Sequence, residues 1–157
     1  LLSRYGRRDY NAPFQHRDTQ FWTLGPHIEW EINPDAELLL GYHYELGDSA
    51  DHKAIYFQDD TSYENHYVSA ELKLELMDRL SAIFIVDYEK KFFTSDHIYD
   101  EHHGASEDLY QGEIELHYAV DKSTAVKIGW QHGSRKLSTE EQHIVNNNIW
   151  IGAQYAF

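Results

Sequence analysis

The last ten residues of the chain are Asn148-Ile149-Trp150-Ile151-Gly152-Ala153-Gln154-Tyr155-Ala156-Phe157, and their side chains alternate in character with a period of two. Successive side chains of a β-strand point to opposite faces. One face would therefore carry Ile149, Ile151, Ala153, Tyr155 and Phe157, and the other Asn148, Trp150, Gly152, Gln154 and Ala156. The stretch predicts a closing strand with one apolar face.

The same alternation recurs through the rest of the chain. We expect strands over residues 1–10, 21–32, 36–46, 65–76, 80–91, 110–120, 126–131 and 148–157, with Pro26 as a weak point in the second. Tight-turn sequences surround Pro34, Asp78 and Lys122, and longer polar connections cover residues 47–61, 94–107 and 133–142. This order predicts an antiparallel up-and-down meander with short turns at one end and long loops at the other.

The closing strand resembles the C-terminal strand of bacterial outer-membrane β-barrel proteins. Gly152, Tyr155 and Phe157 match that family's assembly signal, in which a glycine, an aromatic residue three positions on and a terminal aromatic are read by the barrel-assembly machinery. Trp150 departs from the pattern, because that position is usually polar. The resemblance implies an all-β protein of the Gram-negative outer membrane. Its partners would be outer-membrane lipid, lipopolysaccharide and, during insertion, the assembly machinery.

We therefore predict an antiparallel up-and-down transmembrane β-barrel with about eight strands visible. Residues 1–157 would form either one barrel domain or the C-terminal part of a larger barrel. The sequence contains no run of about 18 apolar residues that would form a transmembrane helix, whereas a transmembrane strand needs only about 9–11 residues.

The formal net charge of −14 argues against nucleic acid as a partner, because phosphate binding requires a basic surface. The absence of cysteine excludes a disulfide framework and thiol chemistry. No nucleophile elbow, HExxH motif or phosphate-binding loop is present. We expect neither enzymatic activity nor a cofactor.

The polar faces of the expected strands are rich in charge. The residues predicted to line a lumen are Glu29, Glu31, Glu71, Lys73, Glu75, Asp87, Glu113, Glu115 and Lys127. A soluble barrel would bury the apolar face and expose the charged face to water. A transmembrane barrel instead turns the apolar face to lipid and the charged face to the lumen. Aromatic residues near the expected strand ends and the strand lengths favour the membrane arrangement.

Histidines in the second long connection suggest a weak metal candidate. His97, His102 and His103 lie there beside Asp96, Asp100 and Glu101, although we expect a solvated loop rather than a specific site.

The favoured function is a passive channel or conduit wall with an acidic lumen that favours cations. A small closed eight-stranded barrel with a structural or surface role is an alternative, in which pairs such as Glu71/Lys73 and Asp87/Lys91 would plug the interior. Two others are a sheath or exporter for a polysaccharide or an electron-transfer protein, and a soluble lipocalin-like carrier.

Overall fold

In the computed structural model, which describes residues 1–50, 59–140 and 143–155, the chain is built from antiparallel strands. The strands are β1 (Leu2–Arg8), β2 (Thr19–Gly25), β3 (His27–Asn33), β4 (Ala36–Ser49), β5 (Tyr63–Met77), β6 (Leu80–Phe93), β7 (Ser106–Ala119), β8 (Thr124–Leu137) and β9 (His143–Tyr155). The described residues contain one helical segment, the 3-10 turn η1 (Phe14–Arg17), and no helix that could cross a bilayer.

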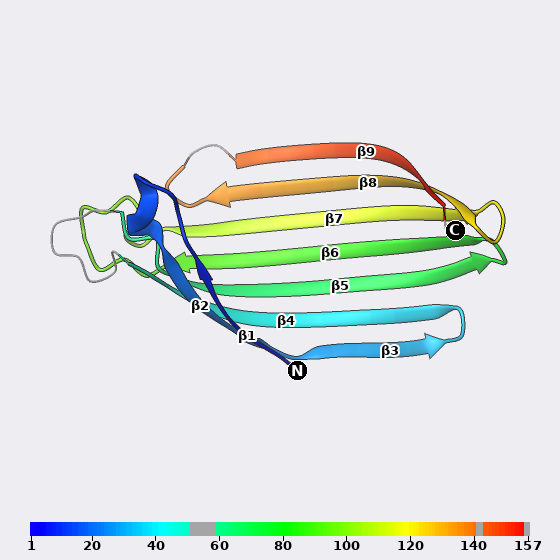
Figure 1. Ribbon diagram of the computed structural model, residues 1–157, viewed down its shortest axis with the longest axis horizontal. Coiled ribbons are helices and arrows are strands. Elements are labelled where there is room, and N and C mark those ends of the chain that lie inside the picture. Colours follow the sequence, from blue (N-terminus) through cyan, green and yellow to red (C-terminus); the bar gives the residue numbers. More distant parts are fainter. Residues whose placement is uncertain (51–58, 141–142, 156–157) are drawn as a thin grey trace.

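All nine strands belong to one sheet with the order β1-β2-β4-β5-β6-β7-β8-β9, in which β3 also pairs with β4 (Figure 1). The prediction of an antiparallel all-β meander is confirmed. The expected closed barrel is not, because β1 and β9 lie at opposite edges of an open sheet. The seven residues of β1 also cover only part of the sheet's height, so β1 could not pair with the thirteen residues of β9 along their full length.

The two ends of the sheet differ in their connections, as Figure 1 shows. At one end, which we call the turn end, short turns join β3 to β4, β5 to β6 and β7 to β8, as the sequence predicted. The opposite end, the loop end, carries η1 and the connection from β6 to β7, and β4 and β8 also end there. The C-terminal end of β9 lies at the turn end.

Several strands are longer than predicted at the loop end. The expectation of a loop from residue 133 is wrong, because β8 continues to Leu137 and pairs with both β7 and β9 up to that end. Likewise β4 extends to Ser49 and β7 begins at Ser106. Ladder hydrogen bonds on both sides therefore override the glycine and serine residues that suggested a loop. Most of the expected connection 47–61 lies outside the described residues.

The predicted strand over residues 21–32 is divided at Pro26 into β2 and β3. Both pair with β4, β2 along one half of it and β3 along the other. Proline removes the ladder donor, but the Pro26 carbonyl still accepts a hydrogen bond from the Tyr42 amide at 3.1 Å. At Gly25 a Cβ atom would lie 1.7 Å from the Tyr42 carbonyl oxygen, so the close approach of β4 requires glycine there.

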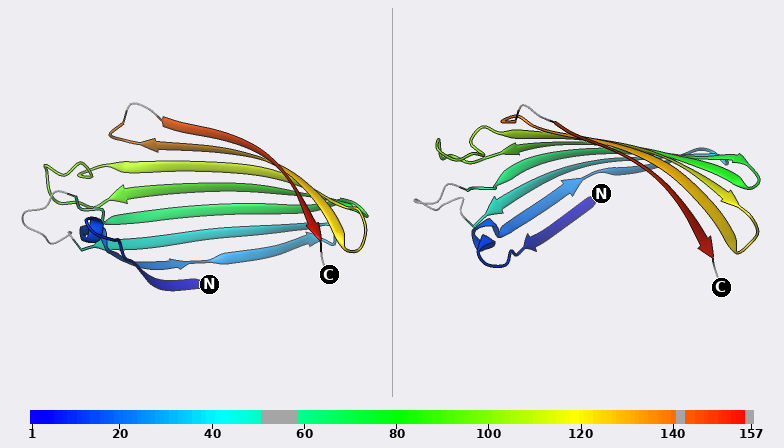
Figure 2. Two further views of the ribbon diagram at one scale, coloured as in Figure 1. Left: turned by 45° about the horizontal axis from the view of Figure 1, so that its top comes forward. Right: turned by 90° about the horizontal axis from the view of Figure 1, so that it is seen from above.

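The sheet curls, and β1 and the end of β9 bend toward the same side (Figure 2). Contacts between the described strands run along the sheet, between ladder neighbours, so no second layer covers either face. Side chains on one face are mostly half-buried, whereas those on the other are mostly exposed. The half-buried face is therefore the concave one, since curvature brings its side chains together.

Candidate functional site

The nine residues predicted to line a lumen lie together on one face of the sheet, which we call the charged face. Residues directly opposite each other in a ladder point to the same side. One row across the sheet is Glu29, Leu39, Glu71, Ile85 and Glu113, and the next is Glu31, Glu37, Lys73, Ile83 and Glu115. Glu75, Ser81, His117 and Lys127 form a third row, and Asp87 lies two residues from Ile85 on β6.

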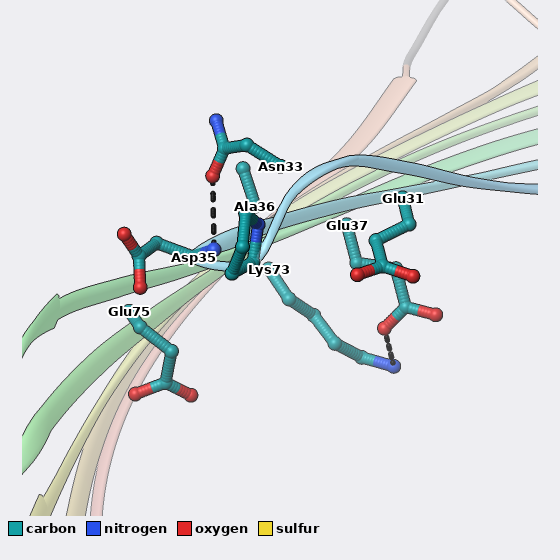
Figure 3. Close-up of a pocket in the computed structure, with 8 residues that line it drawn as sticks. Glu31, Asn33, Asp35, Ala36, Glu37, Lys73 and Glu75 are labelled. Carbon is teal, nitrogen blue, oxygen red and sulfur yellow. Dashed lines mark hydrogen bonds and ion pairs between the residues drawn. The ribbon is translucent and has the colours of Figure 1, made fainter.

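Lys73 is the cation at the centre of the acidic part of this face. Its Nζ lies 3.3 Å from Glu37 Oε2 and 3.4 Å from Glu71 Oε1. The predicted Glu71/Lys73 pair is therefore present. Around it a hollow at the turn end is lined mainly by acidic and turn residues (Figure 3), namely Glu31, Asn33, Pro34, Asp35, Ala36, Glu37, Lys73 and Glu75. One lysine against four carboxylates leaves this hollow negatively charged.

The other predicted ion pair, between Asp87 and Lys91, does not form. The Tyr67 hydroxyl donates to Asp87 Oδ1 at 2.6 Å, and Lys91 Nζ lies 3.7 Å from Glu89 Oε1. Tyr67 lies on the neighbouring strand β5, and a sequence pattern does not show that its hydroxyl reaches this carboxylate.

Glu113 is held by polar side chains of β8 and β9, and Glu115 by a histidine of its own strand, β7. The Trp150 indole donates to Glu113 Oε1 at 3.3 Å, and Gln131 donates to Glu113 Oε2 at 3.4 Å. A His117 ring nitrogen lies 2.6 Å from Glu115 Oε2. Trp150, the residue that departs from the family's terminal pattern, therefore belongs to the charged face as a hydrogen-bond donor.

A buried carboxylate lies on the same face near the loop end. Glu45 is 8% exposed and accepts hydrogen bonds from the Thr23 and Tyr63 hydroxyls, both at 2.6 Å. Arg4 approaches it at 3.3 Å and Arg8 at 3.8 Å. This network joins β1, β2, β4 and β5, and the sequence reasoning missed it because the partners are far apart along the chain.

Three aromatic side chains of the charged face cover glycines on the neighbouring strand. The directly opposed pairs are Gly6 with Phe21, Gly47 with Tyr63 and Gly129 with Trp150. A Cβ atom added to any of these glycines would meet the aromatic ring at 2.4 Å. Such pairs fix strand register, because only glycine leaves room for the ring.

The opposite face, which we call the apolar band, is formed by the alternate residues of the same strands. Its exposed members include Trp22, Leu24, Ile28, Trp30, Leu40, Val68, Phe84, Val86, Ile114, Leu116, Ile128, Trp130, Ile149 and Ile151. Along β4 the band runs over the eleven residues from Ala36 to Leu46, a length of about 34 Å. On a strand tilted by about 40° this covers about 26 Å, close to the height of the apolar surface of a transmembrane barrel.

Aromatic and then charged residues border the band toward the loop end. Tyr88 and Tyr110 are directly opposed with ring centroids 4.6 Å apart, and Tyr5 and Trp22 are 4.7 Å apart. One step closer to the loops, Lys90, Asp108 and Lys136 follow one another across three strands. Lys90 Nζ lies 2.7 Å from Asp108 Oδ2. The order apolar, aromatic, charged is that of a membrane–water boundary.

Of the residues matched to the assembly signal, Gly152 and Tyr155 lie on β9, and Phe157 lies outside the described residues. Tyr155 shares the exposed apolar face of β9 with Ile149 and Ile151, as predicted.

The three histidines predicted as weak metal candidates are separated in the loop between β6 and β7. Only His102 joins a cluster of possible metal ligands, together with Asp59 and Glu101. The ring Nδ1 of His103 instead lies 2.8 Å from the Ser95 carbonyl oxygen, and the His97 amide lies 3.4 Å from Ser95 Oγ.

Asp100 organises this part of the loop end. Burial raises the pKa of its carboxyl group, but hydrogen bonds from the His102 and Asp60 amides and the Ser95 hydroxyl outweigh burial, so the pKa lies below its ordinary value. The carboxylate is therefore charged at neutral pH and holds two separate connections together.

Comparison with protein-family models, with curated proteins and with solved structures finds no match to this chain. The features that bear on function are therefore the charged face, the apolar band and the loop end of the sheet itself.

Proposed function

We propose that the chain forms part of the wall of an outer-membrane β-barrel, with the apolar band against lipid and the charged face lining a water-filled conduit. The observation that carries this proposal is the exposed apolar band bordered by tyrosine and tryptophan and then by charge. An exposed apolar surface of this extent requires a partner, and its sequence of residue types along the strands matches a bilayer.

The curvature of the sheet supports the membrane arrangement over a soluble carrier. A lipocalin-like barrel would curl around its apolar side chains. In this sheet the half-buried side chains, which mark the concave side, are those of the charged face, so the sheet curls toward its charged side chains. In the proposed barrel, the outer edges of β1, β3 and β9 pair with further strands, because no unpaired strand edge is stable in lipid. The assembly machinery and lipopolysaccharide remain the proposed partners.

Single cysteines test which face meets lipid, since the chain has none of its own. We expect Glu113→Cys, in protein reconstituted into vesicles, to react with a water-soluble maleimide, and the neighbouring Ile114→Cys to resist it and react with a lipid-soluble probe. The two positions are adjacent on β7 and point to opposite faces. Equal reaction of both with the water-soluble reagent, or a protein that stays in solution without detergent, would contradict the proposal.

The acidic excess of the charged face supports a conduit that favours cations. Planar-bilayer recordings test this through the reversal potential in a salt gradient. We expect Glu113→Gln to reduce cation selectivity, Glu115→Gln added to it to reduce selectivity further, and Glu64→Gln, which removes one carboxylate from the opposite face, to leave it unchanged. Absence of any ion current from correctly inserted protein refutes the conduit and favours a plugged, structural wall.

A further inference from the structure

Possible metal ligands from two connections meet at the loop end of the sheet. Asp59 lies just before β5, whereas Glu101 and His102 lie between β6 and β7. Each offers one ligand atom, and these atoms all lie within 4.8 Å of one another. We call these three residues the loop cluster.

The imidazole of His102 is held in place from two sides. Its Nδ1 lies 3.2 Å from Asp100 Oδ1, and its ring centroid lies 4.7 Å from that of Phe93. Asp100 is itself fixed by the Ser95 hydroxyl at 2.8 Å and the Asp60 amide at 2.7 Å. The carboxylate of Asp100 therefore orients the ring, as carboxylates commonly do for metal-binding histidines.

The carboxylate of Asp59 lies beside the same imidazole. Its Oδ2 accepts a hydrogen bond from Arg17 Nε at 2.7 Å and lies 3.0 Å from His16 Nε2. Its Oδ1, however, is buried and has no hydrogen-bond partner among the described residues, although it lies only 3.6 Å from His102 Nδ1. A buried carboxylate oxygen without a partner is unfavourable, and a cation at the cluster would satisfy it.

We propose that Asp59, Glu101 and His102 bind a divalent transition-metal ion of the Zn²⁺ class. One imidazole nitrogen and two carboxylates suit zinc rather than Ca²⁺ or Mg²⁺, which prefer oxygen ligands alone. Glu101 is exposed, so its carboxylate can swing onto the ion. Three protein ligands leave one tetrahedral position for water. The ion would join the connection before β5 to the connection between β6 and β7.

The test measures Zn²⁺ binding to the folded full chain by competition with a chromophoric chelator, after treatment with EDTA. We expect one ion per chain to bind well above the background of the other histidines. His102→Ala and Asp59→Asn should each weaken that site at least tenfold, because each removes one ligand from a three-ligand set. The asparagine keeps an oxygen for Arg17, and tryptophan fluorescence verifies that both variants fold.

His97→Ala is the matched control, because it removes a histidine from the same loop outside the loop cluster. It should leave the affinity within twofold. The proposal is overturned if His97→Ala weakens binding as much as His102→Ala, which would mean casual binding by exposed histidines, or if the wild type binds no better than Asp59→Asn. The site does not depend on the conduit, so a protein without ion current could still bind zinc here.

Discussion

The Glu45 network allows a quantitative test of how the edge of the sheet is held. Replacing Glu45 by alanine removes the acceptor of two hydroxyl donors, Thr23 and Tyr63, which are each only 5% exposed. Both buried hydroxyls then lose their acceptor, although the Tyr63 oxygen still accepts from Arg8 Nη1 at 3.4 Å. The variant should loosen the attachment of β1 and β2 to β4 and β5.

The expected magnitude follows from the contacts. A hydrogen bond to a charged acceptor contributes about 1.5–3 kcal/mol, and there are two at 2.6 Å. The Arg4 and Arg8 side chains are half exposed or more, so together they add at most about 1 kcal/mol. Since such contributions are not additive, we expect Glu45→Ala to destabilise the fold by about 3–5 kcal/mol.

The assay is denaturant unfolding of the folded protein, followed by tryptophan fluorescence. Glu29→Ala is the matched control, because its side chain lies on the same face but is 66% exposed. We expect it to change the free energy of unfolding by no more than about 0.5 kcal/mol. A double-mutant cycle of Glu45→Ala with Tyr63→Phe should give a coupling of about 1–2 kcal/mol. Equal effects of Glu45→Ala and Glu29→Ala, or no coupling to Tyr63, would refute the reasoning.

Three further substitutions test other parts of the molecule. Gly25→Ala should prevent folding or strongly destabilise it, because its Cβ would meet backbone, whereas Gly112→Ala has open space; refolding yield compares them. Val86→Arg, at a position 61% exposed within the apolar band, should destabilise the protein in bilayers by about 2–4 kcal/mol, against about 0.5 kcal/mol at most if that face meets water. The amides of Ser123 and Thr124 lower the pKa of Asp121 below its ordinary 3.8. The stability advantage of wild type over Asp121→Asn should therefore be complete above that pH and shrink as the pH falls below it, measured by unfolding midpoints.

The turns and the strand phase were predictable because they depend on local rules. Asn33 shows this well: its Oδ1 accepts a hydrogen bond from the Asp35 amide at 2.9 Å, which is the side-chain turn that the residues Asn33-Pro34-Asp35 suggest. Asp121 caps its turn in the same way. Alternation then assigns each side chain to a face, so the sequence alone predicts the residues of the charged face.

The ends of strands and the contacts between distant residues were not predictable from local rules. β8 continues past Gly133 and Ser134 because β7 and β9 supply hydrogen bonds on both sides, which no local propensity shows. The Glu45 network depends on side chains from four strands, and its partners Arg4 and Tyr63 lie 41 and 18 residues away. Likewise, only folding brings Asp59 beside His102 in the loop cluster.

The surface area of the chain bears on the environment that the sheet requires. The chain exposes 10912 Å², whereas a folded monomer of 18.5 kDa is expected to expose about 8200 Å². Among the described residues the buried hydrophobic ones are Phe21, Tyr63, Ala82 and Ala105, a small set for a chain of this size. The ladder hydrogen bonds define the sheet, but the hydrophobic stabilisation must come from whatever covers the apolar band. Lipid along that band and further strands at the edges of β1, β3 and β9 would supply the missing burial together, which is why the proposal of a barrel wall requires both.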